Sequence, residues 1–441
     1  MSNALKRVMD IRREEWPLAL LMFGYFFLVI TSFWILKPIK KSLFIGFYQA
    51  DGFRLADWAM TAAQAELLAK VLNMGVALVA VTVFSFLARR WHRQQLTAIF
   101  SVFFMICYGL YSLTINHPGD LQVWSFYLFG DLFSTLMVAT FFAFLNDSVT
   151  SDRAKRLYGL VGMGGVTGGA FGSTFVRVWI DEIPRSGWLL ICLGIAAVIV
   201  LLAAAAGRII DRQNWAATPP EPAGRPEAPA GGNPALEGAR LVFRSRYLLA
   251  IVAIVGLYEV VSQVMDFQFT ATVAHYLEGD AIGRHFSTVY AITNITAMVV
   301  QLFLTSFIMT RFGLSAALAV LPIAILLGSA GFLVVPILWM GSLLNTTDNG
   351  FSYSINQSAK EALYVPTTRE EKYKAKAFID MFVQRFAKVL AIGVSLAITT
   401  YFSEFSAVRY LGFFTLAVVV VWLIAVRYAG RRFREVEARS T

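Results

Sequence analysis

The chain has 441 residues, of which 57% are hydrophobic and 15% are charged, and its formal net charge is +10. A soluble globular protein of this composition would leave too much apolar surface in water, so we exclude that class. A nucleic-acid surface would also explain an excess of basic residues, but their distribution along the chain argues against it.

Twelve long apolar stretches lie along the chain, six on each side of one polar segment. They are residues 18–36, 65–87, 96–115, 122–145, 158–180, 187–207, 246–274, 286–309, 314–333, 335–355, 378–400 and 408–428. Each approaches the roughly 20 residues with which an α-helix crosses a bilayer core. Lipid offers no partner to a bare backbone, and continuous apolar runs do not suit a membrane barrel. We predict an all-α polytopic membrane protein with twelve transmembrane helices, arranged as two six-helix bundles like the major facilitator transporters.

The polar segment, residues 208–245, is the predicted linker between the two bundles. It is rich in proline, glycine and alanine, a composition that cannot bury a core. We therefore predict an N-terminal bundle over residues 1–207 and a C-terminal bundle over residues 246–441. Residues 236–246 are predicted to form a short amphipathic helix that leads into the seventh stretch.

Basic residues gather in alternate loops. The two ends of the chain, the linker and every second loop carry most of them, whereas the other loops hold few: Arg54, Arg185, Arg284 and Arg409. This bias predicts that both termini and the linker are cytoplasmic. It also accounts for the net charge, so we predict no nucleic-acid partner.

Six glycines crowd the fifth stretch, at positions 162, 164, 165, 168, 169 and 172. A phosphate-binding loop is excluded, because no strand precedes them and no Gly-Lys-Ser/Thr follows. Four-residue spacings such as Gly164/Gly168 and Gly168/Gly172 favour close packing of two membrane helices. The two cysteines and four histidines show no metal-ligand spacing, and there is no nucleophile–base motif. We predict no metal, no cofactor and no enzyme activity.

Charged residues within the apolar stretches each need a reason, because inserting a charge into a membrane is costly. They are Lys37, Lys40 and Lys41 at the predicted outer end of the first stretch, Glu66 and Lys70 in the second, Asp131 in the fourth, Glu259 and Asp266 in the seventh, and Asp380, Arg385 and Lys388 in the eleventh.

For several of these charges a structural role competes with a role in transport. Lys37 and Lys41 could extend to the membrane surface, Glu66 and Lys70 could form an i,i+4 pair, and Asp380 could complement a helix terminus. Lys40 ends a Lys37-Pro38-Ile39-Lys40 turn that is expected to break the helix beside a cavity. Asp131 and Glu259 either line a central path or pair with neighbouring helices. Cations would attract an anionic substrate, and carboxylates would pair with them in the empty site or carry protons.

Three motifs at these positions resemble the ATP/ADP translocases of plastids and intracellular bacteria. Ile35-Leu36-Lys37-Pro38-Ile39-Lys40-Lys41-Ser42-Leu43 is similar to the family's Ile-Leu-Arg-x-x-Lys-Asp-Ser-Leu. The second motif is Phe144-x-Asn146, followed by Ala154-Lys155-Arg156-Leu157-Tyr158 and a glycine-rich stretch. Lys360-Glu361-Ala362-Leu363-Tyr364-Val365-Pro366 continues to Lys372-x-Lys374-Ala375-Lys376-Ala377-x-Ile379-Asp380, a specific match.

The resemblance implies a twelve-helix exchanger of nucleotides that uses lysines and acidic residues in its central path. The resemblance makes Lys40, Asp131 and Glu259 the leading site residues. It also makes candidates of loop and eleventh-helix residues, namely Lys155, Lys374, Lys376 and Asp380. The predicted substrate-binding set is completed by Lys37, Asp266 and Arg385.

Three departures from the family pattern concern charge. The family's tenth-helix lysines are Asn349 and Ser352 here, and its first-helix aspartate is Lys41. A nucleoside triphosphate needs several cations in a partly dehydrated site, so loss of two lysines weakens the case for ATP.

We expect a secondary transporter that moves a small organic anion by alternating access, with adenine nucleotide exchange as the leading hypothesis. The alternatives are a proton-coupled transporter of another anionic solute, or a lipid flippase on the same fold. We expect membrane lipid as the other partner, a monomeric protein, and a location in the bacterial inner membrane.

Overall fold

The computed structural model describes residues 11–149, 151–212, 234–367, 374–402, 405 and 407–440. The chain divides into two compact units. Unit 1 consists of Met1–Gly224 together with Glu278–Asn294, and unit 2 consists of Arg225–Leu277 together with Ile295–Thr441. Most of the predicted linker, residues 213–233, lies outside the described residues.

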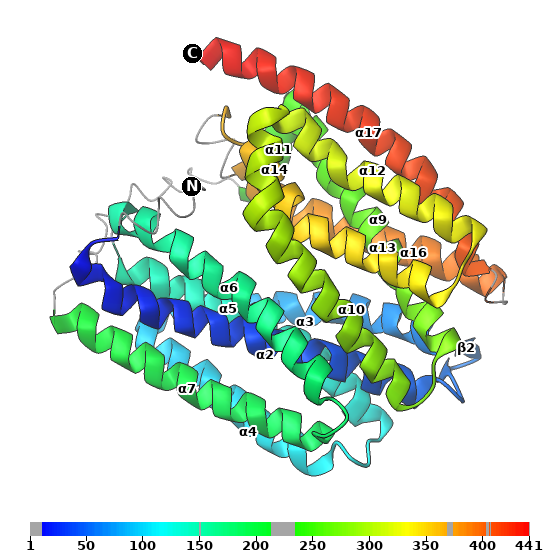
Figure 1. Cartoon of the computed structure of the whole chain (residues 1–441), viewed down its shortest axis with the longest axis horizontal. Coiled ribbons are helices and arrows are strands. Elements are labelled where there is room, and N and C mark those ends of the chain that lie inside the picture. Colours follow the sequence, from blue (N-terminus) through cyan, green and yellow to red (C-terminus); the bar gives the residue numbers. More distant parts are fainter. Residues whose placement is uncertain are drawn as a thin grey trace. The chain divides into compact units, whose positions relative to one another are not determined.

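Unit 1 is built from long helices and one short hairpin (Figure 1). Its elements are η1 (Arg13–Glu15), α2 (Trp16–Tyr48), β1 (Phe53–Leu55), β2 (Trp58–Met60), α3 (Ala62–Arg90), α4 (Arg93–Thr114), α5 (Asp120–Ser148), α6 (Ser151–Trp179), α7 (Arg185–Arg212) and the first part of α10 (Asp280–Val299). The antiparallel hairpin, in which Phe53 pairs with Met60, was not predicted, since its three-residue strands are too short to show a pattern.

Unit 2 contains the remaining helices (Figure 1). They are α8 (Pro234–Arg244), α9 (Arg246–Tyr276), η2 (Val300–Leu304), α11 (Thr305–Arg311), α12 (Gly313–Val334), α13 (Leu338–Phe351), η3 (Ser352–Asn356), α14 (Gln357–Ala362), α15 (Lys376–Phe378), η5 (Ile379–Val383), α16 (Gln384–Tyr401) and α17 (Ala407–Ser440). The segments η2, η3 and η5 are π-helical. Helix α9 packs against α13, α16 and α17, and α12 packs against α17.

The predicted apolar stretches coincide with helices throughout the described chain. Within the described ranges, nine helices are long and apolar enough to cross a membrane. They begin at residues 13, 62, 93, 120, 185, 246, 280, 313 and 407. The prediction of an all-α, multi-pass membrane protein is confirmed at this level. Residues 234–244 form α8, which matches the helix predicted before the seventh stretch.

The prediction for the end of the first span was wrong. Helix α2 continues to Tyr48, twelve residues past the predicted end at 36, and it runs through Pro38 without breaking. Proline removes one backbone hydrogen bond of the helix, but packed neighbours can hold such a helix together. The lysines at 37, 40 and 41 therefore lie within a continuous helix.

The glycines of α6 bring its backbone against that of α2. A Cβ added at Gly164 would lie 2.7 Å from the Phe23 carbonyl oxygen, and one at Gly172 would lie 2.7 Å from the Thr31 carbonyl oxygen. A Cβ at Gly168 would collide with the Phe27 carbonyl, and the Thr31 hydroxyl donates to the Gly168 carbonyl at 3.2 Å. The packing role predicted for the four-residue glycine spacing is confirmed.

Substitution of Gly168 by alanine should separate α2 from α6. Overpacking of this kind costs about 1–3 kcal/mol, so the melting temperature of the purified protein in detergent should fall by several degrees. Gly162→Ala is the matched control, because a Cβ there has nothing within 4 Å. Equal melting temperatures for the two variants would contradict the contact.

Candidate functional site

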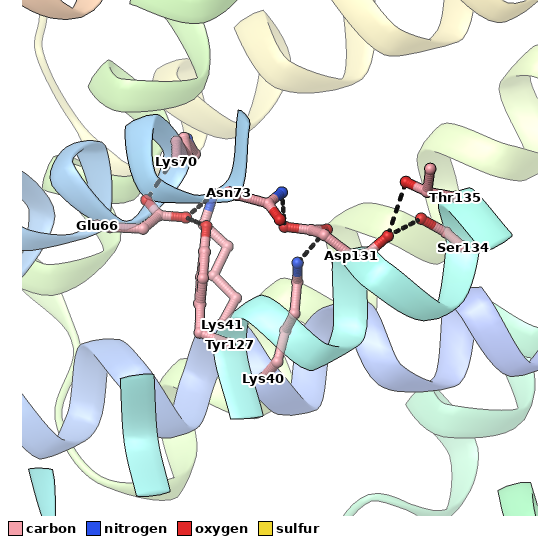
Figure 2. Close-up of polar contacts among 9 residues, drawn as sticks. All are labelled: Lys40, Lys41, Glu66, Lys70, Asn73, Tyr127, Asp131, Ser134 and Thr135. Carbon is pink, nitrogen blue, oxygen red and sulfur yellow. Dashed lines mark hydrogen bonds and ion pairs between the residues drawn. The ribbon is translucent and has the colours of Figure 1, made fainter. Parts of the chain in front are cut away.

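A partly buried ion pair between α2 and α5 forms the centre of the candidate site in unit 1. The Lys40 ammonium donates to the Asp131 carboxylate (Figure 2). The Lys40 side chain is 6% exposed and that of Asp131 is 26% exposed. A Cβ at Gly130 would lie 2.7 Å from the Lys40 side chain, so a glycine in α5 makes room for the lysine. Of the two alternatives for Asp131, this contact shows pairing with a neighbouring helix, and its place in a central path stays a prediction.

Asp131 is also held by a neutral donor from α3. The Asn73 side-chain amide donates to the second carboxylate oxygen, Oδ2, at 2.8 Å (Figure 2). The hydroxyls of Ser134 and Thr135 donate to the Asp131 backbone carbonyl at 2.9 and 3.0 Å. The carboxylate therefore keeps a hydrogen bond even when its lysine moves, which lowers the cost of breaking the ion pair.

A second cluster adjoins the first. Glu66 of α3, whose side chain is 1% exposed, lies 3.4 Å from the Lys41 ammonium and 3.7 Å from that of Lys70. The Tyr127 hydroxyl donates to Glu66 Oε1 at 2.8 Å. The expected i,i+4 pair between Glu66 and Lys70 is present. Lys41 is buried beside Glu66 instead of reaching toward the membrane surface, because the carboxylate compensates its charge inside the bundle.

Lys37 lies among aromatic rings. Its ammonium is 4.4 Å from the ring centroid of Trp34, 4.8 Å from that of Tyr290 and 5.8 Å from that of Phe33. Such rings attract a cation through their quadrupole. Together with Lys40, Lys41 and Lys70, this residue places four ammonium groups in one part of unit 1, alongside two carboxylates. That arrangement can bind an anion with more than one negative charge.

The buried charges of unit 2 are mostly acidic. Glu259 in α9 lies 3.4 Å from the Lys388 ammonium in α16. One face of α9 meets α13, where the Asn345 amide lies 3.5 Å from Asp266 Oδ1 and the Ser262 hydroxyl donates to Asp348 Oδ2 at 2.6 Å. In the described part of the chain, no group of three or more His, Cys, Asp and Glu side chains is placed to hold a metal ion.

Comparison with known proteins identifies the family. The family model described as TLC ATP/ADP transporter matches residues 118–339 and 334–433. The chain belongs to the TLC ATP/ADP transporter family. It is 24% identical over 350 residues to the plastidic ATP/ADP-transporter of Solanum tuberosum, covering 71% of this chain and 54% of that protein. It is 21% identical over 493 residues to ADP,ATP carrier protein 1 of Chlamydia pneumoniae, covering 96% and 92%. The chain thus spans about half the length of the plastid relative.

Solved transporter structures show the same fold. A bacterial homologue of the lysosomal transporter Spinster, in an inward-facing and unoccupied conformation, aligns with a TM-score of 0.59 at 13% identity and covers 97% of this chain and 99% of its own. The nucleoside transporter NupG aligns with a TM-score of 0.65 at 14% identity, covering 93% and 99%. These neighbours support a major-facilitator-type fold for this TLC family member.

Lys374, Lys376 and Asp380, which the resemblance to the translocases singles out, belong to unit 2. The Lys376 ammonium lies 2.5 Å from Glu361, and the half-buried Lys374 precedes it in π-helical backbone. Asp380 is exposed and accepts from Gln384 at 3.1 Å, and the half-buried Arg385 follows in α16. Lys155 lies in α6, but its side chain is outside the described part of the structure.

The sequence analysis missed three residues that complete these sites: Asn73, Tyr127 and Asp348. The first two are neutral, so a search for charges within apolar stretches does not find them. Asp348 lies within the tenth stretch and the same search would have found it; its side chain is buried, with 1% of the residue exposed.

Removal of Asp131 should destabilise unit 1 by leaving the Lys40 ammonium buried beside a neutral residue. We expect Asp131→Leu to cost about 3 kcal/mol or less, since Asp131 is partly exposed. The double variant Lys40→Met/Asp131→Leu should regain most of that loss. Thermal unfolding of the wild type, both single variants and the double variant measures the coupling between the residues. Additive effects of the two substitutions would contradict a buried ion pair.

Proposed function

We propose that this chain is a secondary transporter that exchanges adenine nucleotides by alternating access. The observation that carries the proposal is the buried Lys40–Asp131 pair, in a chain that belongs to the TLC ATP/ADP transporter family. A phosphoryl oxygen is a strong acceptor for an ammonium donor. It therefore competes with the Asp131 carboxylate for Lys40.

In the proposed cycle the empty carrier holds Lys40 against Asp131. An entering phosphoryl group takes the ammonium, and Asp131 keeps the hydrogen bond from Asn73. The exchange gives the Lys40 ammonium a new anionic partner, while the Asp131 carboxylate, which is partly exposed, keeps a neutral hydrogen-bond donor. Because substrate and carboxylate use the same donor, substrate binding favours the conformation in which the pair is open.

The membrane arrangement is part of the proposal. Nine described helices qualify as membrane-crossing segments, and we propose that α6, α13–η3–α14 and α15–η5–α16 supply three more, giving twelve in two six-helix bundles. The proposed bundles are residues 1–207 and 246–441, joined by the linker. Both termini and the linker would face the cytoplasm of a bacterial cell, with the carrier acting as a monomer in the inner membrane.

The acidic residues of unit 2 have a proposed part in the same cycle. Glu259 would hold the Lys388 ammonium in the empty carrier, as Asp131 holds Lys40. Asp266 and Asp348 would repel a phosphate that approached them and so restrict where its charge can lie. Lys155, Lys374 and Lys376 would contact the nucleotide at the ends of the helices.

Counterflow tests the proposal directly. Proteoliposomes loaded with ADP should take up labelled ATP from outside in a saturable way, and Lys40→Ala should reduce the rate at least tenfold, because the donor to the phosphoryl group is lost. Arg284→Gln is the control that removes one positive charge from the exposed pair with Asp181 in the same unit.

Two outcomes would contradict the nucleotide proposal. Folded wild-type protein that exchanges no adenine nucleotide but accumulates another anion along a proton gradient would be a proton-coupled carrier. Movement of labelled lipid between leaflets, again without nucleotide exchange, would make the protein a flippase.

A further inference from the structure

The buried Glu66 carboxylate has a lysine beside each of its two oxygens. Lys41 lies 3.4 Å from Glu66 Oε1, and Lys70 lies 3.7 Å from Glu66 Oε2 (Figure 2). The lysine side chains are 5% and 16% exposed. Because they come from α2 and α3, the two ammonium groups are held by separate helices around one anionic position.

This cluster is looser than the Lys40–Asp131 pair. A charge-assisted hydrogen bond from an ammonium to a carboxylate is about 2.7–2.9 Å long, and both distances to Glu66 exceed this range. At these distances the attraction between each lysine and Glu66 is mainly that between their charges. An incoming phosphoryl oxygen would break no short lysine–Glu66 hydrogen bond.

The clusters around Asp131 and Glu66 are built in the same way. Asp131 pairs with one lysine and Glu66 with two, and each carboxylate also has a neutral donor, which is Asn73 for Asp131 and Tyr127 for Glu66. The neutral donor can keep the carboxylate hydrogen-bonded after its lysine has moved to a substrate. Tyr127 also links the clusters, since the Lys40 ammonium lies 4.5 Å from its ring centroid while its hydroxyl reaches Glu66.

We propose that Lys41, Glu66 and Lys70 form a second phosphoryl subsite beside Lys40, so that the site selects substrates with at least two linked phosphoryl groups. This inference rests on the proposed function and assigns a specificity role to residues outside it. The Tyr127 side chain adjoins both positions, because the Lys40 ammonium lies 4.5 Å from its ring centroid and its hydroxyl donates to Glu66 Oε1 at 2.8 Å. Neighbouring groups of one polyphosphate chain can therefore reach both. A nucleoside monophosphate would occupy only the Lys40 position.

Competition against labelled ATP in counterflow tests this inference. In the wild type, ADP should inhibit uptake at much lower concentration than AMP. In Lys41→Gln and Lys70→Gln the inhibition constant for ADP should rise about tenfold, corresponding to about 1.4 kcal/mol, while that for AMP should change less than twofold. Tyr127→Phe, which keeps the ring near Lys40, should shift the ADP constant in the same direction. Arg284→Gln should leave both constants unchanged.

Equal changes in the ADP and AMP constants, or no change in either, would overturn the subsite. Failure of the wild type to exchange nucleotides would instead overturn the proposed function. In that case, thermal stabilisation by inorganic pyrophosphate and by inorganic phosphate still tests the subsite. A larger stabilisation by pyrophosphate that is lost in Lys41→Gln, but kept in Arg284→Gln, supports it; equal stabilisation by the two anions overturns it. Comparing Lys41→Gln with Lys41→Arg, in which the charge is restored, separates loss of the subsite from misfolding.

Discussion

Burial of charge inside an apolar bundle is the constraint on which the rest of unit 1 depends. An isolated ammonium or carboxylate there would cost several kcal/mol, so each must meet a group of opposite charge. Lys40 and Lys41, consecutive on α2, meet Asp131 from α5 and Glu66 from α3. Because both pairs must form together, the rotation of α2 about its axis is fixed relative to two neighbours. In the proposed cycle an anionic substrate takes over the ammonium, while the neutral donors Asn73 and Tyr127 stay hydrogen-bonded to the carboxylates.

Close packing of the α6 backbone against α2 also fixes the position of α2. Glycines of α6 let it lie against the backbone of α2 at Phe23, Phe27 and Thr31, along the part of the helix that precedes the lysines. Gly130 of α5 likewise leaves room for Lys40. Membrane helices gain little from the hydrophobic effect between them, so such contacts supply packing that bulky residues would prevent. Helix α2 is therefore held by small residues on one partner and by charge on others.

The departures from the translocase pattern change where lysines and carboxylates lie along the chain. Asn349 and Ser352 stand where the family has lysines, while Lys41 stands in place of an aspartate. Unit 1 accordingly gathers ammonium groups, whereas unit 2 holds a half-buried Asp266 and a buried Asp348. The lysines proposed to bind phosphoryl groups lie instead on α2 and α3.

The sequence by itself determined that the chain is helical, crosses a membrane repeatedly and carries charge within its spans, because bilayer thickness and desolvation act on any segment whatever its neighbours. The glycine spacing of α6 and the Glu66–Lys70 pair were also predictable, since both are local to one helix. Tertiary structure alone decided that α2 runs past Pro38 to Tyr48 and that Lys41 stays inside. Hydropathy assigns each lysine the full penalty for entering lipid, whereas carboxylates and hydrogen-bond donors from helices distant in the sequence offset that penalty. The packing of the helices decides which residues these are. Two of them, Asn73 and Tyr127, show no recognisable pattern in the sequence.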